Sequence, residues 1–104
     1  MSFDYAPYTE LINNLPTKIW MGSEQVDAVG GAYFEVEDPA TGEVLAKVAD
    51  ADSSQWKKTL DLADGVQNTW AKDFTARQRA DVLMALFDAV QNRADDFAKV
   101  MTLE

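Results

Sequence analysis

The sequence predicts an α+β fold in which a short helix and two β-hairpins precede two or three α-helices. Phe34 and Val36 alternate with Glu35 and Glu37, as in a strand that buries one face. In the same way, Val44, Ala46 and Val48 alternate with Leu45, Lys47 and Ala49. After Asp50, apolar residues recur every three or four positions, which is the spacing of one helix face. Because the strands come first and the helices follow, the order fits an α+β arrangement.

A chain of 104 residues is long enough for one small domain, so residues 1–104 are interpreted as a single segment. Within it we expect a helical arm at residues 1–16, hairpins at residues 17–49 and helices at residues 52–104. Apolar residues make up 47% of the chain and aromatic residues 11%, a composition typical of a folded chain and not of a disordered one.

The arm is predicted to contain a helix of about two turns. Four apolar residues share one helical stripe: Tyr8, Leu11, Ile12 and Leu15. Pro7 suits the first helical position, and Pro16 stops the helix because the residue before a proline is pushed away from helical angles. A helix this short is marginal in water, so we expect it to dock on another element.

The first hairpin is predicted from residues 18–21 and 24–27, with Gly22-Ser23 as a type II′ turn. The second pairs residues 33–37 with residues 43–49. Asp38-Pro39-Ala40-Thr41-Gly42 joins its strands as a turn, since Asp suits the first position, Pro fixes φ at the second and Gly accepts a positive φ at the exit.

The helical half is predicted to begin at Asp52 or Ser53, both of which are good N-caps. Its first helix has an apolar face formed by Trp56, Leu60, Ala63 and Trp70 and widened by Leu62 and Val66. Gly65 weakens this helix by roughly 1 kcal/mol relative to Ala, so we expect it at a close helix contact.

A second helix start is predicted at Thr75, because Gln78 follows three residues later in a capping-box pattern. Its apolar stripe contains Val82, Leu83, Leu86, Phe87 and Val90. A bend near Asn92 is expected to introduce a third helix at residues 94–103.

Composition excludes several classes of function. A net charge of −9 opposes nucleic acid and anionic membranes as partners, because both require clustered Lys and Arg. The chain has no Cys and no His, which excludes thiolate catalysis, disulfides, Ser-His-Asp chemistry and His-ligated zinc within it. Residues 1–15 lack the basic region of a secretory signal, so the cytoplasm is the expected location.

The sequence offers weak hints of a binding or catalytic site. The carboxylate pairs Asp61/Asp64 and Asp95/Asp96 fit solvated helix faces better than acid–base or metal sites. The tryptophans Trp20, Trp56 and Trp70 could form a stacking platform. The helical spacing of Trp56 and Trp70 favours packing in a core instead. Gly30-Gly31 lacks the third Gly of a phosphate loop.

Arg77 and Arg79 lie near a helix start and could attract an anion. They are two residues apart and so diverge around the helix axis, which favours surface salt bridges instead.

Three stretches resemble the N-terminal region of the aldehyde dehydrogenase superfamily. Residues 18–28 are similar to its opening hairpin, and residues 34–48 contain its Asp-Pro-Ala-Thr-Gly-Glu turn. Residues 76–83, followed by Phe97 and residues 101–104, resemble the helix pair that leads to the family's Glu-x-Gly-Lys-Pro segment. The chain departs from the family at Gly22-Ser23, where the family usually has Gly-Gly. Within the family, its sequence resembles the succinate-semialdehyde dehydrogenase branch most.

The resemblance implies an enzyme that oxidises an aldehyde, such as succinate semialdehyde, to the carboxylate with NAD or NADP. The family's Cys nucleophile, Glu base and cofactor motifs match no position here, so the expected catalytic, cofactor-binding and metal residues of this chain are none. Residues 1–104 would flank the cofactor-binding domain of the α/β parent. The chain stops inside a helical pattern at Thr102-Leu103-Glu104, so we expect a fragment that is inactive alone.

As a fragment, the chain is expected to bind the remainder of the parent enzyme and to associate with itself through apolar helix faces. The alternative is a stand-alone acidic helical module that binds a basic partner. That module would show a cooperative thermal transition and binding that weakens with salt.

Overall fold

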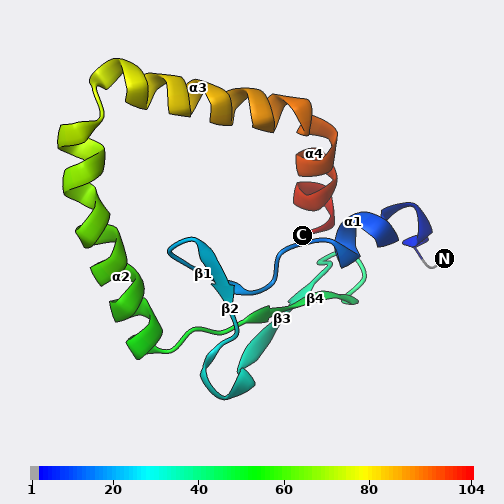
Figure 1. The fold of residues 1–104 in the computed structure, drawn as a ribbon. Coiled ribbons are helices and arrows are strands. Elements are labelled where there is room, and N and C mark those ends of the chain that lie inside the picture. The colour runs from blue at the N-terminus through cyan, green and yellow to red at the C-terminus, as the bar shows by residue number, and fades with distance from the viewer. Residues whose placement is uncertain (1–2) are drawn as a thin grey trace.

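A computed structural model describes residues 3–104 and confirms the α+β order of elements (Figure 1). The helices and strands are η1 Ala6–Tyr8, α1 Thr9–Asn13, β1 Ile19–Met21, β2 Glu24–Val26, η2 Val29–Gly31, β3 Tyr33–Glu37, β4 Val44–Ala49, α2 Ser53–Asn68, η3 Thr69–Asp73, α3 Ala76–Asn92 and α4 Ala94–Leu103. Strands β1 and β2 form one antiparallel hairpin, and β3 and β4 form another. No helix in residues 3–104 is long and apolar enough to cross a membrane.

The N-terminal arm is a 3₁₀ turn followed by the short helix α1, with Pro7 in the first turn as predicted. The helix ends at Asn13, and the Asn14 N–H caps it by donating to the Glu10 carbonyl at 3.2 Å. Leu15 therefore lies beyond the helix and not on its stripe. Leu15 and Ile12 instead line a shallow groove against the second hairpin, so the arm docks as its shortness requires.

The first hairpin has the predicted two-residue turn. Met21 pairs with Glu24, which leaves Gly22 and Ser23 as the loop. Gly22 has φ 64° whereas Ser23 has negative φ, the sign pattern of a type II′ turn. The hairpin lies against α2 at this point, because a Cβ on Gly22 would be 3.6 Å from the Leu62 Cδ1.

The second hairpin contains a β-bulge that the alternation of its residues did not predict. Val36 pairs with Ala46, but Glu37 pairs with Val44, so Leu45 is the extra residue. Leu45 is half-buried, and Val44 is exposed. The predicted alternation is therefore correct from Ala46 onward and wrong at the start of β4.

Local side-chain caps fix the start of α2. The Asp52 carboxylate accepts the Gln55 N–H at 3.0 Å, while the Gln55 side chain accepts the Asp52 N–H at 3.3 Å. Asp52 is therefore the N-cap, and Ser53 is the first helical residue. Hydrogen bonds from the Ser54 hydroxyl and the Gln55 N–H hold the pKa of Asp52 below its ordinary value. Gln55 also donates to the Asp27 carbonyl at 3.0 Å, which ties α2 to the first hairpin.

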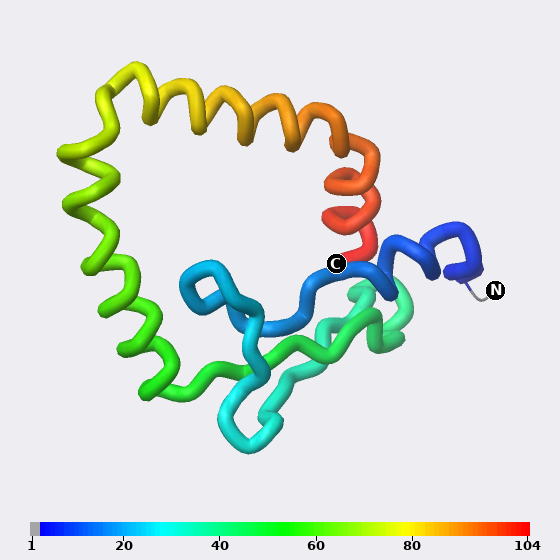
Figure 2. The backbone as a smooth tube through the Cα atoms, viewed as in Figure 1, coloured from blue at the N-terminus to red at the C-terminus, as the bar shows by residue number. Residues whose placement is uncertain are grey.

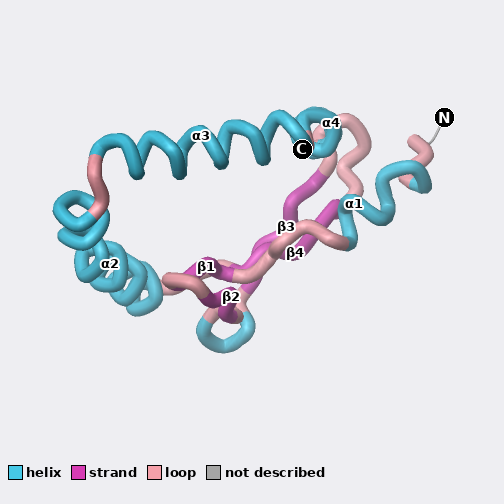
Figure 3. The backbone as a smooth tube through the Cα atoms, turned by 45° about the horizontal axis from the view of Figure 1, so that its top comes forward, coloured by secondary structure: helices cyan, strands magenta, loops and turns pink. Residues whose placement is uncertain are grey.

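Helices α2 and α3 are separated by a π-type turn, η3, and the predicted capping box of Thr75 and Gln78 is present. Arg93, with φ −119° and ψ 24°, produces the expected bend before α4. Each turn redirects the chain, so α2, α3 and α4 follow one another around an open frame whose remaining side is formed by the hairpins (Figure 2). In a second view, α3 again lies well apart from β1 and β2 (Figure 3).

The open frame leaves the chain with very little core. Among residues 3–104, the buried residues are Met21, Ala28, Leu103 and Asp38. The radius of gyration is 17.5 Å, whereas a compact domain of this length has a value of about 13 Å. The helices therefore gain little of the burial that normally stabilises a domain.

Two sequence predictions about packing are wrong for this reason. Trp56 is not in a core but 63% exposed, because no other element of residues 3–104 covers that side of α2. Gly65 meets no neighbouring atom within 4 Å, so it is not at a close helix contact. Trp70 is half-buried and packs against Phe74 with the ring centroids 5.5 Å apart.

Candidate functional site

The carboxylate pairs singled out in the sequence do not form a site. Asp61 and Asp64 are exposed on α2, and Asp95 is exposed at the start of α4. Asp96 lies 3.5 Å from the Nε of Arg93 and forms an ion pair with it. Within residues 3–104, no group of three or more acidic side chains is placed to hold a metal ion. These carboxylates are therefore better explained as part of the solvent-exposed faces of their helices.

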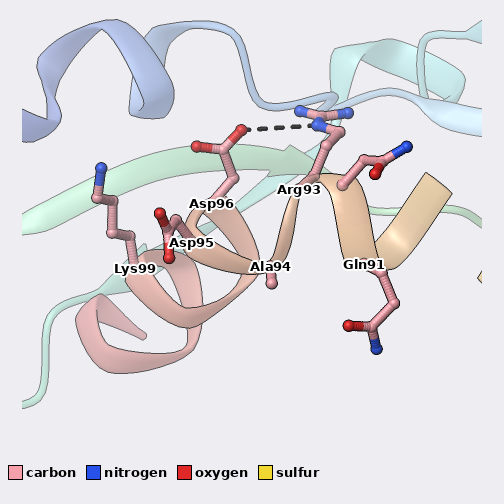
Figure 4. A pocket seen from close by; sticks show the side chains of 7 residues that line it. Gln91, Arg93, Ala94, Asp95, Asp96 and Lys99 are labelled. Atoms are coloured by element: carbon pink, nitrogen blue, oxygen red, sulfur yellow. Dashed lines mark ion pairs between the residues drawn. The ribbon is translucent and has the colours of Figure 1, made fainter. Parts of the chain in front are cut away.

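The junction of α3 and α4 forms a polar hollow of about 410 Å³, shown in Figure 4. Its lining residues are Gln91, Asn92, Arg93, Ala94, Asp95, Asp96 and Lys99. The guanidinium of Arg93 is already paired with Asp96, and Gln91 points away from this ion pair. The hollow therefore presents balanced charges and no nucleophile.

The two arginines near the start of α3 have different roles. Arg77 forms the predicted surface ion pair with Asp81 at 3.5 Å. Arg79 forms no ion pair of the predicted kind. Its Nη1 donates instead to the carbonyls of Phe74, Ala71 and Trp70 at 2.6, 3.3 and 3.5 Å. Arg79 thus satisfies carbonyls left without helical partners at the π-type turn, and its Nη1 is engaged by the backbone.

A buried carboxylate holds the N-terminal arm onto the second hairpin. Asp38 is 4% exposed, and its two carboxylate oxygens accept the Ala40 N–H at 2.8 Å and the Tyr5 hydroxyl at 2.7 Å. The Tyr5 hydroxyl also contacts the Thr41 hydroxyl. Partial removal from water, together with the hydrogen bond to Asp38, raises the pKa of Tyr5 above its ordinary value of 10.0. The turn that carries the family resemblance is therefore also where the arm is attached.

This contact predicts an arm that is released in alkaline solution. Because the pKa of Tyr5 is raised in the folded state, its contribution to docking is complete below pH 10.0 and is lost as the pH rises through the higher folded value. Hydrogen exchange of the α1 amides should therefore accelerate above pH 10, after correction for intrinsic exchange. In Tyr5→Phe the α1 amides should exchange quickly at all pH values, whereas in Tyr8→Phe they should exchange as in the unmodified chain. If exchange in Tyr5→Phe still accelerated above pH 10, Tyr5 could not be the group responsible.

Exposed apolar side chains gather on helices α2 and α3. More than half of the exposed large apolar side chains in residues 3–104 belong to these two helices. On α2 they are Trp56, Leu60, Leu62 and Val66, and on α3 they are Val82, Leu83, Met84, Leu86, Phe87 and Val90. We call this set the α2–α3 face. The stripes were predicted from the sequence except for Met84. Association through apolar helix faces was expected, whereas Trp56 was expected in a core.

The residues present do not fit a nicotinamide cofactor. Gly30 and Gly31 lie in the three-residue turn η2, which starts no long helix. At the start of α2, the N-terminal N–H groups that could bind a phosphate face the carboxylate of Asp52 instead. At the start of α3 the Thr75 hydroxyl occupies the corresponding position. At each of these two helix starts the N-cap side chain therefore already accepts one of the N–H groups.

Comparison with known protein families supports the resemblance seen in the second hairpin and the helices. Residues 26–104 match the sequence profile described as the aldehyde dehydrogenase family. The match begins at Val26, so it includes the Asp38 turn and all of the long helices, while most of the opening hairpin lies outside it. No solved structure matches the chain significantly. With more than half of its residues matched, the chain belongs to the aldehyde dehydrogenase family.

Proposed function

We propose that this chain is the N-terminal scaffold of an NAD(P)-dependent aldehyde dehydrogenase located in the cytoplasm, and that it is inactive without the rest of that enzyme. The observation that carries the proposal is the exposed α2–α3 face, which a self-sufficient domain would bury. In the enzyme, this face would pack against the cofactor-binding domain that the chain flanks.

The parent reaction that we propose is oxidation of an aldehyde to the carboxylate, with succinate semialdehyde as the first substrate to test. This choice rests on the resemblance of the chain to the succinate-semialdehyde dehydrogenase branch within the family. The chain contains no Cys, so a thiol nucleophile and the hydride acceptor would both come from the remainder of the enzyme. The contribution of residues 3–104 would be to hold that remainder in its folded arrangement.

Reconstitution tests this proposal directly. The purified chain, incubated with succinate semialdehyde and either NAD or NADP, should reduce neither cofactor. Adding it to a succinate-semialdehyde dehydrogenase that lacks the matching segment should restore turnover. Turnover by the chain alone would contradict its lack of an active site, and failure to restore turnover with aldehyde dehydrogenases of this or other branches would contradict the scaffold role.

The alternative of an acidic interaction module is favoured only by the net charge, and that charge is unevenly distributed. Residues 1–52 contain two positively charged and ten negatively charged side chains. Residues 53–104 contain seven positively charged and eight negatively charged side chains. A basic partner would therefore bind the arm and hairpins and not the helices. Binding that weakens as salt rises, together with a cooperative thermal transition of the monomer, would favour this alternative over the scaffold.

A further inference from the structure

The exposed surface of the chain is far larger than a monomer of its mass requires. The solvent-accessible area is 8213 Å² for a mass of 11.5 kDa. A compact monomer of that mass exposes about 5,800 Å², which leaves an excess of roughly 2,400 Å². A standard protein–protein interface takes about 800 Å² from each partner, so the excess is ample for a stable one.

From this excess and from the charge distribution, we infer that the 104-residue chain by itself forms a symmetric dimer through the α2–α3 face. This inference concerns the chain alone and does not depend on the proposed function. The helices that carry this face have few neighbours in the fold. Every residue of α3 except Arg79 is exposed. Two copies that share one apolar face can cover it mutually in a closed, twofold arrangement.

The charges of the chain favour a second copy of these helices as the occupant. Residues 53–104 carry seven positive and eight negative side chains, so their net charge is only −1. Lys57 and Lys58 stand beside Asp61 on α2, and Arg77 pairs with Asp81 on α3. A rim with both signs interspersed can complement its own copy, whereas the arm and hairpins, with two positive and ten negative side chains, would repel theirs. The dimer should therefore join helices to helices and keep the hairpins apart.

A pair of lysine variants on α3 tests the interface. Leu86 is 59% exposed within the α2–α3 face, and Ala85 is an exposed residue of the same helix that is turned about 100° away from Leu86 and is outside the set. Leu86→Lys and Ala85→Lys change the net charge equally, so only the position of the new charge differs. In sedimentation velocity over a series of concentrations, the apparent mass of the unmodified chain should rise to twice the monomer mass of 11.5 kDa. Leu86→Lys should raise the dissociation constant at least tenfold, whereas Ala85→Lys should leave it within about twofold.

Hydrogen exchange of the unmodified chain provides a readout that needs no variant. Amides of α2 and α3 should exchange more slowly at high protein concentration than at low, while amides of β1 and β2 should not change. Strict monomer at high concentration, open-ended polymers in place of dimers, or equal weakening by both lysine variants would overturn the inference. A chain that stays monomeric alone but forms a one-to-one complex with the remainder of an aldehyde dehydrogenase would assign the face to that partner instead.

Discussion

Replacing Asp38 with alanine should destabilise the second hairpin by about 2 kcal/mol, because it removes a buried acceptor from two part-buried hydrogen bonds. The carboxylate accepts the Ala40 N–H and the Tyr5 hydroxyl, and only 4% of the residue is exposed to water. The measurement is the opening free energy of the hairpin, from hydrogen exchange of the Gly42 amide, which donates to the Asp38 carbonyl at 2.7 Å. The same change should release the arm, since Tyr5 loses its acceptor.

Two further variants separate the role of Asp38 from a general effect of removing acidic charge. Asp38→Asn retains one oxygen to accept the Ala40 N–H and should lose roughly half of the effect. Asp50→Ala removes a carboxylate of the same kind from an exposed position and should leave the opening free energy nearly unchanged. If Asp38→Ala exchanged no faster than Asp50→Ala, the buried carboxylate could not be what holds the turn.

Features that depend on a few neighbouring residues were predictable from the sequence. The Gly22-Ser23 turn, the Asp38 to Gly42 turn and the capping box of Thr75 and Gln78 each require particular side chains at fixed spacing. Their geometry is determined by local sterics and local hydrogen bonds, which do not depend on the rest of the fold. The order of helices and hairpins follows from the same local patterns.

Features that depend on distant neighbours were not predictable. The bulge at Leu45 arises from the pairing of β4 with β3, and alternation along one strand does not reveal it. The exposure of Trp56 depends on which elements cover α2, and an apolar stripe looks the same in sequence whether its partner lies within the chain or outside it. The sequence therefore predicted the residues of the α2–α3 face, while the open frame shows which parts of it the chain leaves uncovered.

The role of Arg79 belongs to this second class. Its interaction with three carbonyls requires the π-type turn, which no spacing of residues indicated. A turn with i→i+5 hydrogen bonds leaves carbonyls directed away from the helix ladder, and these need another donor. All three carbonyls are contacted by one guanidinium nitrogen, Nη1, which the planar group holds in a fixed direction.

Arg79→Ala should therefore disorder the junction between α2 and α3, at a cost of about 2 kcal/mol in local stability. The Phe74 carbonyl, 2.6 Å from Nη1, loses its donor, and the carbonyls of Trp70 and Ala71 lose the longer hydrogen bonds from the same nitrogen. The amides of residues 69–74 should exchange faster, and far-UV circular dichroism should show a loss of helix near this turn. Arg79→Lys should rescue only part of the effect, because a strongly hydrated ammonium on a flexible stem is not held in one direction as the guanidinium nitrogen is.

Arg77→Ala is the matched control, because it removes an arginine from the same helix turn. Its ion pair with Asp81 is exposed and should contribute no more than about 0.5 kcal/mol, a difference that the same exchange measurement can resolve. Equal acceleration of residues 69–74 in the two variants would mean that helix charge, and not carbonyl capping, stabilises the junction. A large effect confined to Arg79→Ala would instead show that one side chain sets the angle between α2 and α3, and with it the shape of the α2–α3 face.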